Sequence, residues 1–128
     1  MHTFSVRIFY EDTDHSGFVY HANYLKYFER ARESMIGFDV MRDIEHHDGL
    51  GFVVVRCELI FREGAVFGDE LTILSSAEQA SPYRLVCNQE ARRGDRRLVD
   101  ATVELAMITR DKKLVKLSEK VTRRFLNP

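Results

Sequence analysis

The N-terminal stretch of the chain alternates between apolar and polar positions. The apolar side chains lie two residues apart, at Phe4, Val6, Ile8 and Tyr10, with Ser5 and Arg7 facing the other way. A period of two is typical of a β-strand with one buried face. The pattern therefore predicts a half-buried strand that ends at the acidic segment beginning with Glu11.

From about residue 20 the period changes to that of a helix. Apolar side chains recur at helical spacing along one stripe, formed by Tyr20, Tyr24, Phe28, Ala31 and Met35. Such a stripe predicts an amphipathic helix over about 20–36 with a buried apolar face. We expect Gly37 to end this helix, because glycine readily adopts the left-handed conformation found at helix ends.

Beyond a polar loop that contains His46, His47 and Asp48, the pattern predicts strands separated by turns. The turn signals are Gly64, Gly68-Asp69, Ser81-Pro82, Gly94-Asp95 and Arg110-Asp111. Two strands alternate clearly, with inward faces formed by Val53, Val55, Cys57, Leu59 and Phe61, and by Val99, Ala101, Val103, Leu105 and Met107. Residues 118–125 predict a short C-terminal helix.

These elements predict one α+β domain over residues 1–128, in which an antiparallel sheet covers one long helix. The outward-facing side chains still include Val54, Ile60 and Leu74. A second copy of the chain would cover them through a symmetric interface. We therefore expect a homodimer or a homotetramer.

Composition excludes several classes of function. The 19 Lys and Arg residues nearly balance the 20 Asp and Glu residues and are dispersed, unlike the one-sided charge of a nucleic-acid-binding protein. We expect a cytoplasmic protein without a membrane span, because there is no long apolar run and no secretion signal. Cys57 and Cys87 lie in apolar alternations, which predicts buried thiols rather than a disulfide or zinc framework.

The candidate chemistry lies between the first strand and the helix. Glu11, Asp12 and Asp14 precede the predicted helix start and are followed by Gly17. Helix starts carry partial positive charge and free N–H groups, which stabilise carboxylates and bound anions. Ordinary capping of the helix is one interpretation of this cluster.

Two metal-binding interpretations fit less well. Residues 12–17 match the opening of a calcium loop, but Asn23 stands where such a loop has a bidentate glutamate. Asp12, Asp14, His15 and His21 are suitable ligand types for a transition metal, but their spacing is not diagnostic. We expect no metal and no other cofactor.

A catalytic interpretation uses the same groups differently. One carboxylate would attack a carbonyl or activate water, while N–H groups at the helix start hold the carbonyl oxygen. Gly17 would let a substrate approach the backbone closely, because it has no Cβ. The acidic cluster alone does not decide between capping and catalysis.

Three segments within residues 4–36 resemble one enzyme family. They are Tyr10-Glu11-Asp12-Thr13-Asp14, the GFVYHANY stretch at 17–24, and Phe28-Glu29-Arg30-Ala31-Arg32. With Gly68-Asp69-Glu70-Leu71, they are similar to hotdog-fold thioesterases of the 4-hydroxybenzoyl-CoA thioesterase type. The most similar branch contains the Tol-Pal-associated acyl-CoA thioesterases and related acyl-carrier-protein thioesterases. Residues 111–117 depart from the pattern, since many relatives have a proline-containing strand there.

The resemblance implies a helix wrapped by an antiparallel sheet, paired subunits, and metal-free hydrolysis of acyl-CoA or acyl-carrier-protein thioesters. By position, it implies Asp14 as nucleophile or general base and a structural role for Asp12. It also implies that the backbone N–H of His21 polarises the substrate carbonyl. Gly17, Val19 and Tyr20 are the residues expected to contact substrate.

Two questions of partner and role stay open in the sequence. Basic residues that could bind nucleotide phosphates or an acidic carrier are Arg92, Arg93, Arg96, Arg97, Lys112, Lys113 and Lys116, although solvated charge on turns is the better explanation for any single one of them. A non-catalytic acyl-thioester-binding subunit is the alternative to an enzyme. Such a subunit would tolerate replacement of Asp14, whereas an enzyme would not.

Overall fold

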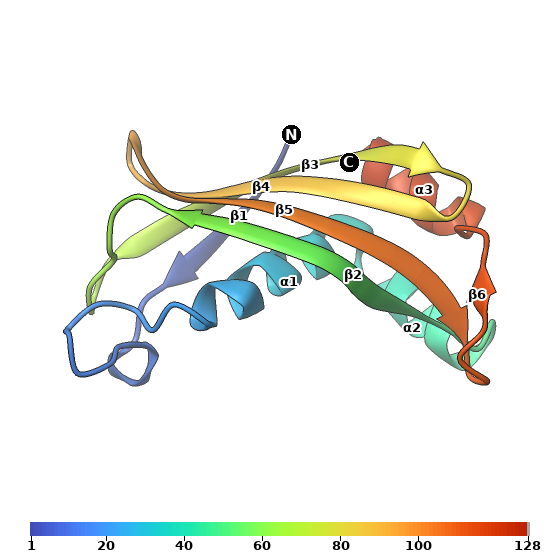
Figure 1. The fold of residues 1–128 in the computed structure, drawn as a ribbon, viewed down its shortest axis with the longest axis horizontal. Helices are drawn as coiled ribbons and strands as arrows, with labels where there is room; N and C mark the ends of the chain where they lie inside the picture. The colour runs from blue at the N-terminus through green and yellow to red at the C-terminus, as the bar shows by residue number, and fades with distance from the viewer. Residues whose placement is uncertain (128) are drawn as a thin grey trace.

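The computed structural model, which describes residues 1–127, contains one antiparallel sheet and three α-helices (Figure 1). The strands are β1 (His2–Arg7), β2 (Leu50–Phe61), β3 (Glu70–Ser81), β4 (Arg84–Arg93), β5 (Arg96–Thr109) and β6 (Leu114–Val115). They are ordered β1-β3-β4-β5-β2, and β6 pairs with the end of β5. The predicted turns all fall between strands or at strand ends.

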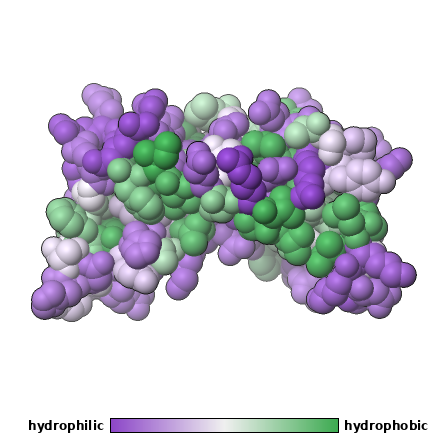
Figure 2. Space-filling model, in the orientation of Figure 1, coloured by the Kyte–Doolittle hydropathy of each residue, from purple (hydrophilic) through white to green (hydrophobic). Residues whose placement is uncertain are grey.

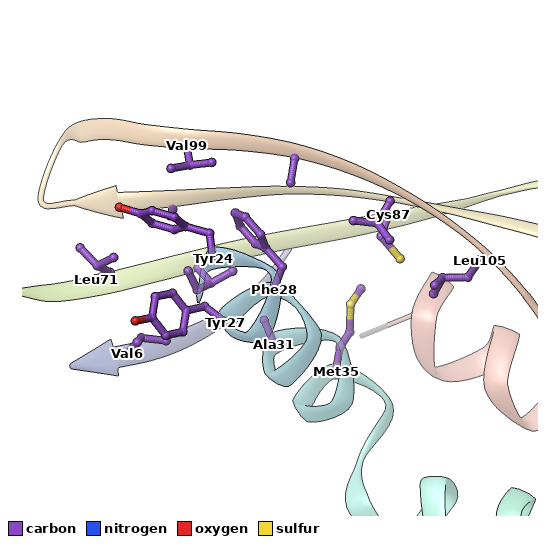
Figure 3. Packing of buried hydrophobic residues seen from close by; sticks show 14 of the residues in the cluster. Val6, Tyr24, Tyr27, Phe28, Ala31, Met35, Leu71, Cys87, Val99 and Leu105 are labelled. Atoms are coloured by element: carbon purple, nitrogen blue, oxygen red, sulfur yellow. The ribbon is translucent and has the colours of Figure 1, made fainter. Parts of the chain in front are cut away.

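The sheet curves around α1 (Asn23–Ile36), which lies along its inner side (Figure 1). Tyr24, Phe28 and Ala31 are at most 2% exposed, and they pack with inward-facing sheet residues such as Leu71 and Val99 (Figure 3). Burying one large apolar side chain contributes about 1.5–3 kcal/mol. The stripe predicted from the sequence therefore holds the helix to the sheet, and the α+β architecture is confirmed.

The segment before α1 differs from the predicted pattern. β1 ends at Arg7, and Tyr10 lies in a short 3₁₀ helix (Tyr10–Asp12) where it is 79% exposed. The expectation that Tyr10 faces the core is wrong, although Val6 and Ile8 are buried. Residues 21 and 22 form a turn, and so α1 begins three residues later than the periodicity indicates; Tyr20, expected on the buried stripe, lies before the helix and is 45% exposed.

Gly37 ends α1 as predicted, and the structure supplies two reasons. Its φ is +98°, which side chains rarely tolerate, and a Cβ at this position would lie 2.6 Å from Nη1 of Arg124. That guanidinium donates a hydrogen bond to the backbone oxygen of Ile36 at 2.6 Å. Arg124 belongs to α3 (Glu119–Leu126), the short helix predicted near the C-terminus.

A second helix, α2 (Phe38–His46), occupies part of the segment where the sequence predicted a polar loop. His46 is its last residue, and only His47, Asp48 and Gly49 lie between α2 and β2. A single residue of α2, Ile44, is buried. With nine residues the helix spans fewer than three turns, too short a stretch to establish a helical period, and so the sequence pattern missed it.

β2 departs from regular alternation at a β-bulge. Its register with β5 shifts between Val54 and Arg56. The alternation of side chains before the bulge is therefore out of phase with the alternation after it. Val54 therefore shares the helix side with Cys57 instead of facing outward. The Cys57 side chain is also exposed, whereas Cys87 is buried. The prediction of a buried thiol is correct for Cys87 and wrong for Cys57.

β2 also forms an edge of the sheet. Val54, Val55, Ile60 and Phe61 are 44–50% exposed, and Figure 2 shows apolar surface on the side of the molecule where β2 runs. Within residues 1–127, the edge of β2 that faces away from β5 has no paired strand. In the same range, no helix has both the length and the hydrophobicity needed to cross a bilayer.

Candidate functional site

Asp12 fastens the segment after β1 to the start of α1. Its Oδ2 accepts the backbone N–H of Phe9 at 2.7 Å, and its Oδ1 accepts the side-chain amide of Asn23 at 3.1 Å. Its backbone oxygen accepts the N–H of Tyr20 at 2.9 Å. Both carboxylate oxygens are thus engaged in holding the chain, which leaves Asp12 a structural group.

Asp14 lies at the tip of a tight turn that follows. An isolated antiparallel bridge joins Thr13 to Val19, and the N–H of Gly17 donates to the backbone oxygen of Asp14 at 3.0 Å. Gly17 has a φ of +87° and open space around the position of a Cβ. Glycine is therefore needed here for the backbone conformation, which is a different reason from the close substrate approach expected from the sequence.

The carboxylate of Asp14 has one engaged oxygen and one free oxygen. Its Oδ1 accepts the N–H of Ser16 at 2.8 Å and the Ser16 hydroxyl at 2.5 Å, whereas Oδ2 has no hydrogen-bond donor among residues 1–127. The Ser16 hydroxyl bond, followed by the backbone bond and the nearby charges of His21 and His15, lowers the pKa of Asp14. An exposed carboxylate of this kind is ionised at neutral pH.

His21 lies in the turn that precedes α1, and its backbone N–H is free. The N–H groups of Tyr20 and Asn23 donate to Asp12 and Tyr20, but that of His21 has no acceptor within the described chain. The His21 ring packs against Tyr20 and Phe61, with centroid distances of 4.6 and 6.2 Å. The turn thus presents an unused donor at the start of a helix, where anionic oxygens are stabilised.

A cavity of about 270 Å³ opens beside this turn, lined by Phe18, Val19, His21, Tyr24, Phe61, Arg62, Glu63 and Gly64. The structure thus brings Val19 and His21 to one cavity, with Asp14 close enough for the charge of His21 to act on its pKa. Gly17 and Tyr20 do not line the cavity, although the Tyr20 ring contacts that of His21.

The sequence missed two aromatic residues of this cavity. Phe61 comes from the end of β2, and its pattern indicated only a core-facing strand residue. The Phe18 ring lies where a side chain at position 64 would be, since a Cβ on Gly64 would approach it to 2.4 Å. The glycine identified as a turn signal therefore also makes room for the ring of Phe18.

The candidate arginines for a carrier are already paired within the chain. Arg92 contacts Glu90, Arg93 contacts Asp69, Arg96 contacts Glu63, and Arg97 contacts Glu90 and Asp100. Lys112, Lys113 and Lys116 form no ion pair with residues 1–127, and they lie near β6. Figure 1 places β6 at the opposite end of the domain from the turn that carries Asp14.

No cluster suited to a metal ion occurs in the described part of the chain. Three or more His, Cys, Asp or Glu side chains do not converge anywhere within residues 1–127. His15 and His21 contribute instead to the electrostatics of Asp14.

Comparison with known proteins gives a consistent family. Residues 10–125 match the family model of the thioesterase-like superfamily. Acyl-CoA thioesterase YbgC of Haemophilus influenzae is 33% identical over 109 residues, which cover 83% of this chain and 79% of that protein. Acyl-CoA thioesterase YbgC of Helicobacter pylori is 38% identical over 86 residues, which cover 66% of this chain and 62% of that protein.

Solved structures agree with the fold. A probable thioesterase from Bartonella henselae has a TM-score of 0.84 and 33% identity, covering 91% of this chain and 98% of the other. A 1,4-dihydroxy-2-naphthoyl-CoA thioesterase from Synechocystis has a TM-score of 0.88 at 22% identity, covering 97% and 94% of the two chains. The hotdog fold expected from the sequence resemblance is confirmed.

We expect Ser16→Ala to raise the pKa of Asp14 toward its ordinary value. The Ser16 hydroxyl bond favours the ionised carboxylate, so its removal makes protonation easier, while the backbone N–H bond persists. A titration of the Asp14 carboxyl carbon by NMR measures the change, with the exposed Ser5→Ala as control. An unchanged Asp14 pKa in Ser16→Ala would contradict this electrostatic assignment.

Proposed function

Because the chain belongs to the thioesterase-like superfamily and is therefore a thioester hydrolase, we propose that it hydrolyses acyl-CoA thioesters at the turn carrying Asp14. The observation that supports this most is the pairing of two unused groups there. Asp14 offers a free carboxylate oxygen, and His21 offers a free backbone N–H beside a cavity.

The two groups have complementary tasks in thioester hydrolysis. The carbonyl oxygen of the substrate accepts the His21 N–H, which stabilises the negative charge that develops as the carbonyl carbon is attacked. Asp14 either attacks that carbon itself or takes a proton from the attacking water. The thiolate then leaves, and the acid is released once water has supplied its oxygen and protons.

The low pKa of Asp14 suits both versions of this step. A nucleophile or base must be ionised before it reacts, and the bonds from Ser16 keep the carboxylate in that form. The same bonds hold one oxygen in place and leave the other to react. Positioning of this kind lowers the entropic part of the barrier.

We further propose that the enzyme works as a homodimer or as a homotetramer built from such dimers. A 12-residue edge strand with exposed apolar side chains is a strong site for pairing with another strand. Pairing of β2 with β2 of a second copy is self-complementary, as a two-fold interface requires. The cavity beside His21 includes Phe61 of β2, so a second copy at this edge would border the site.

For the carrier, we favour coenzyme A over acyl carrier protein. The sequence relatives from Haemophilus influenzae and Helicobacter pylori are both named as acyl-CoA thioesterases. Arg62, which lines the cavity, is paired with Asp100, and Arg96 is paired with Glu63 of the same cavity lining, which weakens both as a docking surface for an acidic carrier protein. Acyl carrier protein substrates belong in the same assay as a comparison.

We expect Asp14→Asn to lower kcat/KM for acyl-CoA hydrolysis by roughly 10²–10⁴-fold, because the amide neither attacks nor accepts a proton. Thiol release from a panel of short, long and aromatic acyl-CoAs measures this loss. The exposed Asp111→Asn, at the other end of the domain, serves as the matched control. Full activity in Asp14→Asn would favour a non-catalytic role for this carboxylate and a binding subunit instead of an enzyme.

Replacements at His21 separate its backbone from its side chain. His21→Ala keeps the N–H and should retain most activity, whereas His21→Pro removes it and should cost roughly 10²–10³-fold in kcat. Circular dichroism and thermal melting check that both variants fold. Equal losses in the two variants would assign the effect to the imidazole and contradict the proposed role of the N–H.

A charge on the β2 edge should disrupt the dimer. Val55→Lys places an ammonium at the bulge of the exposed edge, where burial against a second copy is unfavourable. Analytical ultracentrifugation should show a shift toward monomer, with loss of activity at low concentration. Leu114→Lys on β6, 52% exposed and away from β2, is the control; an unchanged mass in Val55→Lys would contradict the β2 interface.

A further inference from the structure

Two cavities that adjoin each other lie farther along α1 than the cavity at His21, with which they share no lining residue. Their volumes are about 260 and 240 Å³, and both are lined by Glu29, Arg32 and Val54. The first begins at Leu25, the residue after Tyr24 in the His21 cavity. The second ends beside Phe52 and Phe125. Together they follow the seam between α1 and β2, away from the turn that carries Asp14.

Arg32 is the most unusual residue on this seam. It is 7% exposed, although arginine is almost never this deeply buried without a paired charge. Its only hydrogen bond runs from Nη1 to Oε1 of Gln89 at 3.0 Å, and within residues 1–127 no carboxylate lies within ion-pair distance of it. Burial lowers the pKa of the guanidinium, which nevertheless stays cationic.

The guanidinium is held rigidly in this position. Gln89 is 4% exposed, and its amide donates to the backbone oxygen of Phe28 at 3.0 Å and to the Ser75 hydroxyl at 2.9 Å. The bond from Arg32 therefore goes to a fixed acceptor in the core. Four of the five N–H donors of the guanidinium have no partner in the described chain, and the residue faces two cavities.

The chemistry of this arrangement favours a carboxylate. A guanidinium with free parallel donors binds carboxylates in a bidentate manner, more strongly than it binds neutral acceptors. Glu29 also lines both cavities, but it is exposed and remains solvated without contacting Arg32 at ion-pair distance. Leu25, Val54 and Val103 supply apolar walls between the His21 end and Arg32.

The length of the seam sets the length of the molecule that fits. Gln89 joins Arg32 to the Phe28 carbonyl, so the guanidinium lies about level with the middle of α1. From His21 to that level is roughly 10–15 Å at 1.5 Å per helical residue, the span of an extended chain of roughly eight to twelve carbons.

We infer that Arg32 binds a carboxylate at the far end of the acyl chain, which makes medium-chain ω-carboxyacyl thioesters the preferred substrate class. This inference rests on the proposed thioesterase function, with the thioester carbonyl at His21. Arg32 takes no part in the reaction; it determines specificity by compensating its own buried charge with the charge of the substrate.

The test compares thioesters that differ only at the far end. Decanoyl-CoA is compared with the mono-CoA thioester of decanedioic acid, and butanoyl-CoA with the mono-CoA thioester of butanedioic acid. We expect kcat/KM to favour the ten-carbon diacid by about 10- to 100-fold, the discrimination expected of a buried charged hydrogen bond. The four-carbon pair should show no such preference, because neither end reaches Arg32.

Substitutions assign the preference to one side chain. Arg32→Met keeps a long side chain and removes its charge. The preference for the ten-carbon diacid thioester should then disappear, because kcat/KM for that substrate falls. Arg32→Lys should keep part of it, since an ammonium is charged but lacks the bidentate geometry. Arg30→Met, an exposed position on the same helix, should leave the ratio unchanged. If Arg32→Met fails to fold, the ratio in Arg32→Lys decides.

The outcomes separate this inference from the function on which it rests. Equal rates for decanoyl-CoA and its diacid counterpart in the native enzyme would overturn the role of Arg32 and leave the thioesterase intact. A dimer that dissociates in Arg32→Met with an unchanged ratio would overturn it too, because Arg32 would then bind the second copy. If no thioester is hydrolysed, the proposed function fails, and calorimetry with free decanedioate against decanoate then decides whether Arg32 holds a carboxylate.

Discussion

The packing of α1 against the inner side of the sheet is the constraint on which the other features depend. One side of the helix is completely occupied by this contact, through Tyr24, Phe28 and Ala31. The contact fixes the helix axis relative to β3 and β1, and hence the place of the helix start. With one side buried, the seam toward β2 is the side of α1 along which the three cavities open. Because a close-packed interior is hardly compressible, the position of the buried side of the helix also fixes the position of its start.

Periodicity predicted this architecture well because burial imposes it directly. The stripe on α1 and the alternation along β5 both describe residues with one buried face; the stripe is confirmed from Tyr24 to Met35, and the alternation along β5 in full. The prediction failed where an element is short or the backbone irregular. α2 has only nine residues, and the bulge at Val54 inserts one residue that no pattern of two can register. As a result, Val54 lies beside Cys57 on the seam instead of on the outward side assigned to it.

The candidate site was predictable in its parts but not in its geometry. Family resemblance singled out Asp14 and His21, and the fold places both near one cavity; their catalytic roles stay a prediction. The structural role of Asp12 depends on bonds to Phe9 and Asn23, which the sequence does not reveal. Phe61 joins the site from a strand and lies 40 residues after His21 in the chain. A contact of that kind arises from sheet topology and leaves no local signal.

Asp14, in the turn before α1, and Arg32, on α1 itself, represent opposite electrostatic situations. Asp14 is exposed, and two hydrogen bonds from Ser16 stabilise its charge. The ionised carboxylate therefore carries little free-energy penalty in the folded protein. Arg32 is buried with one neutral partner, so its charge is costly until an anion reaches it. A buried cation without a counter-ion destabilises the free protein, and a ligand that supplies the counter-charge recovers that free energy on binding. The same burial therefore weakens the fold and strengthens discrimination between charged and neutral chain ends, because only a charged end removes the penalty.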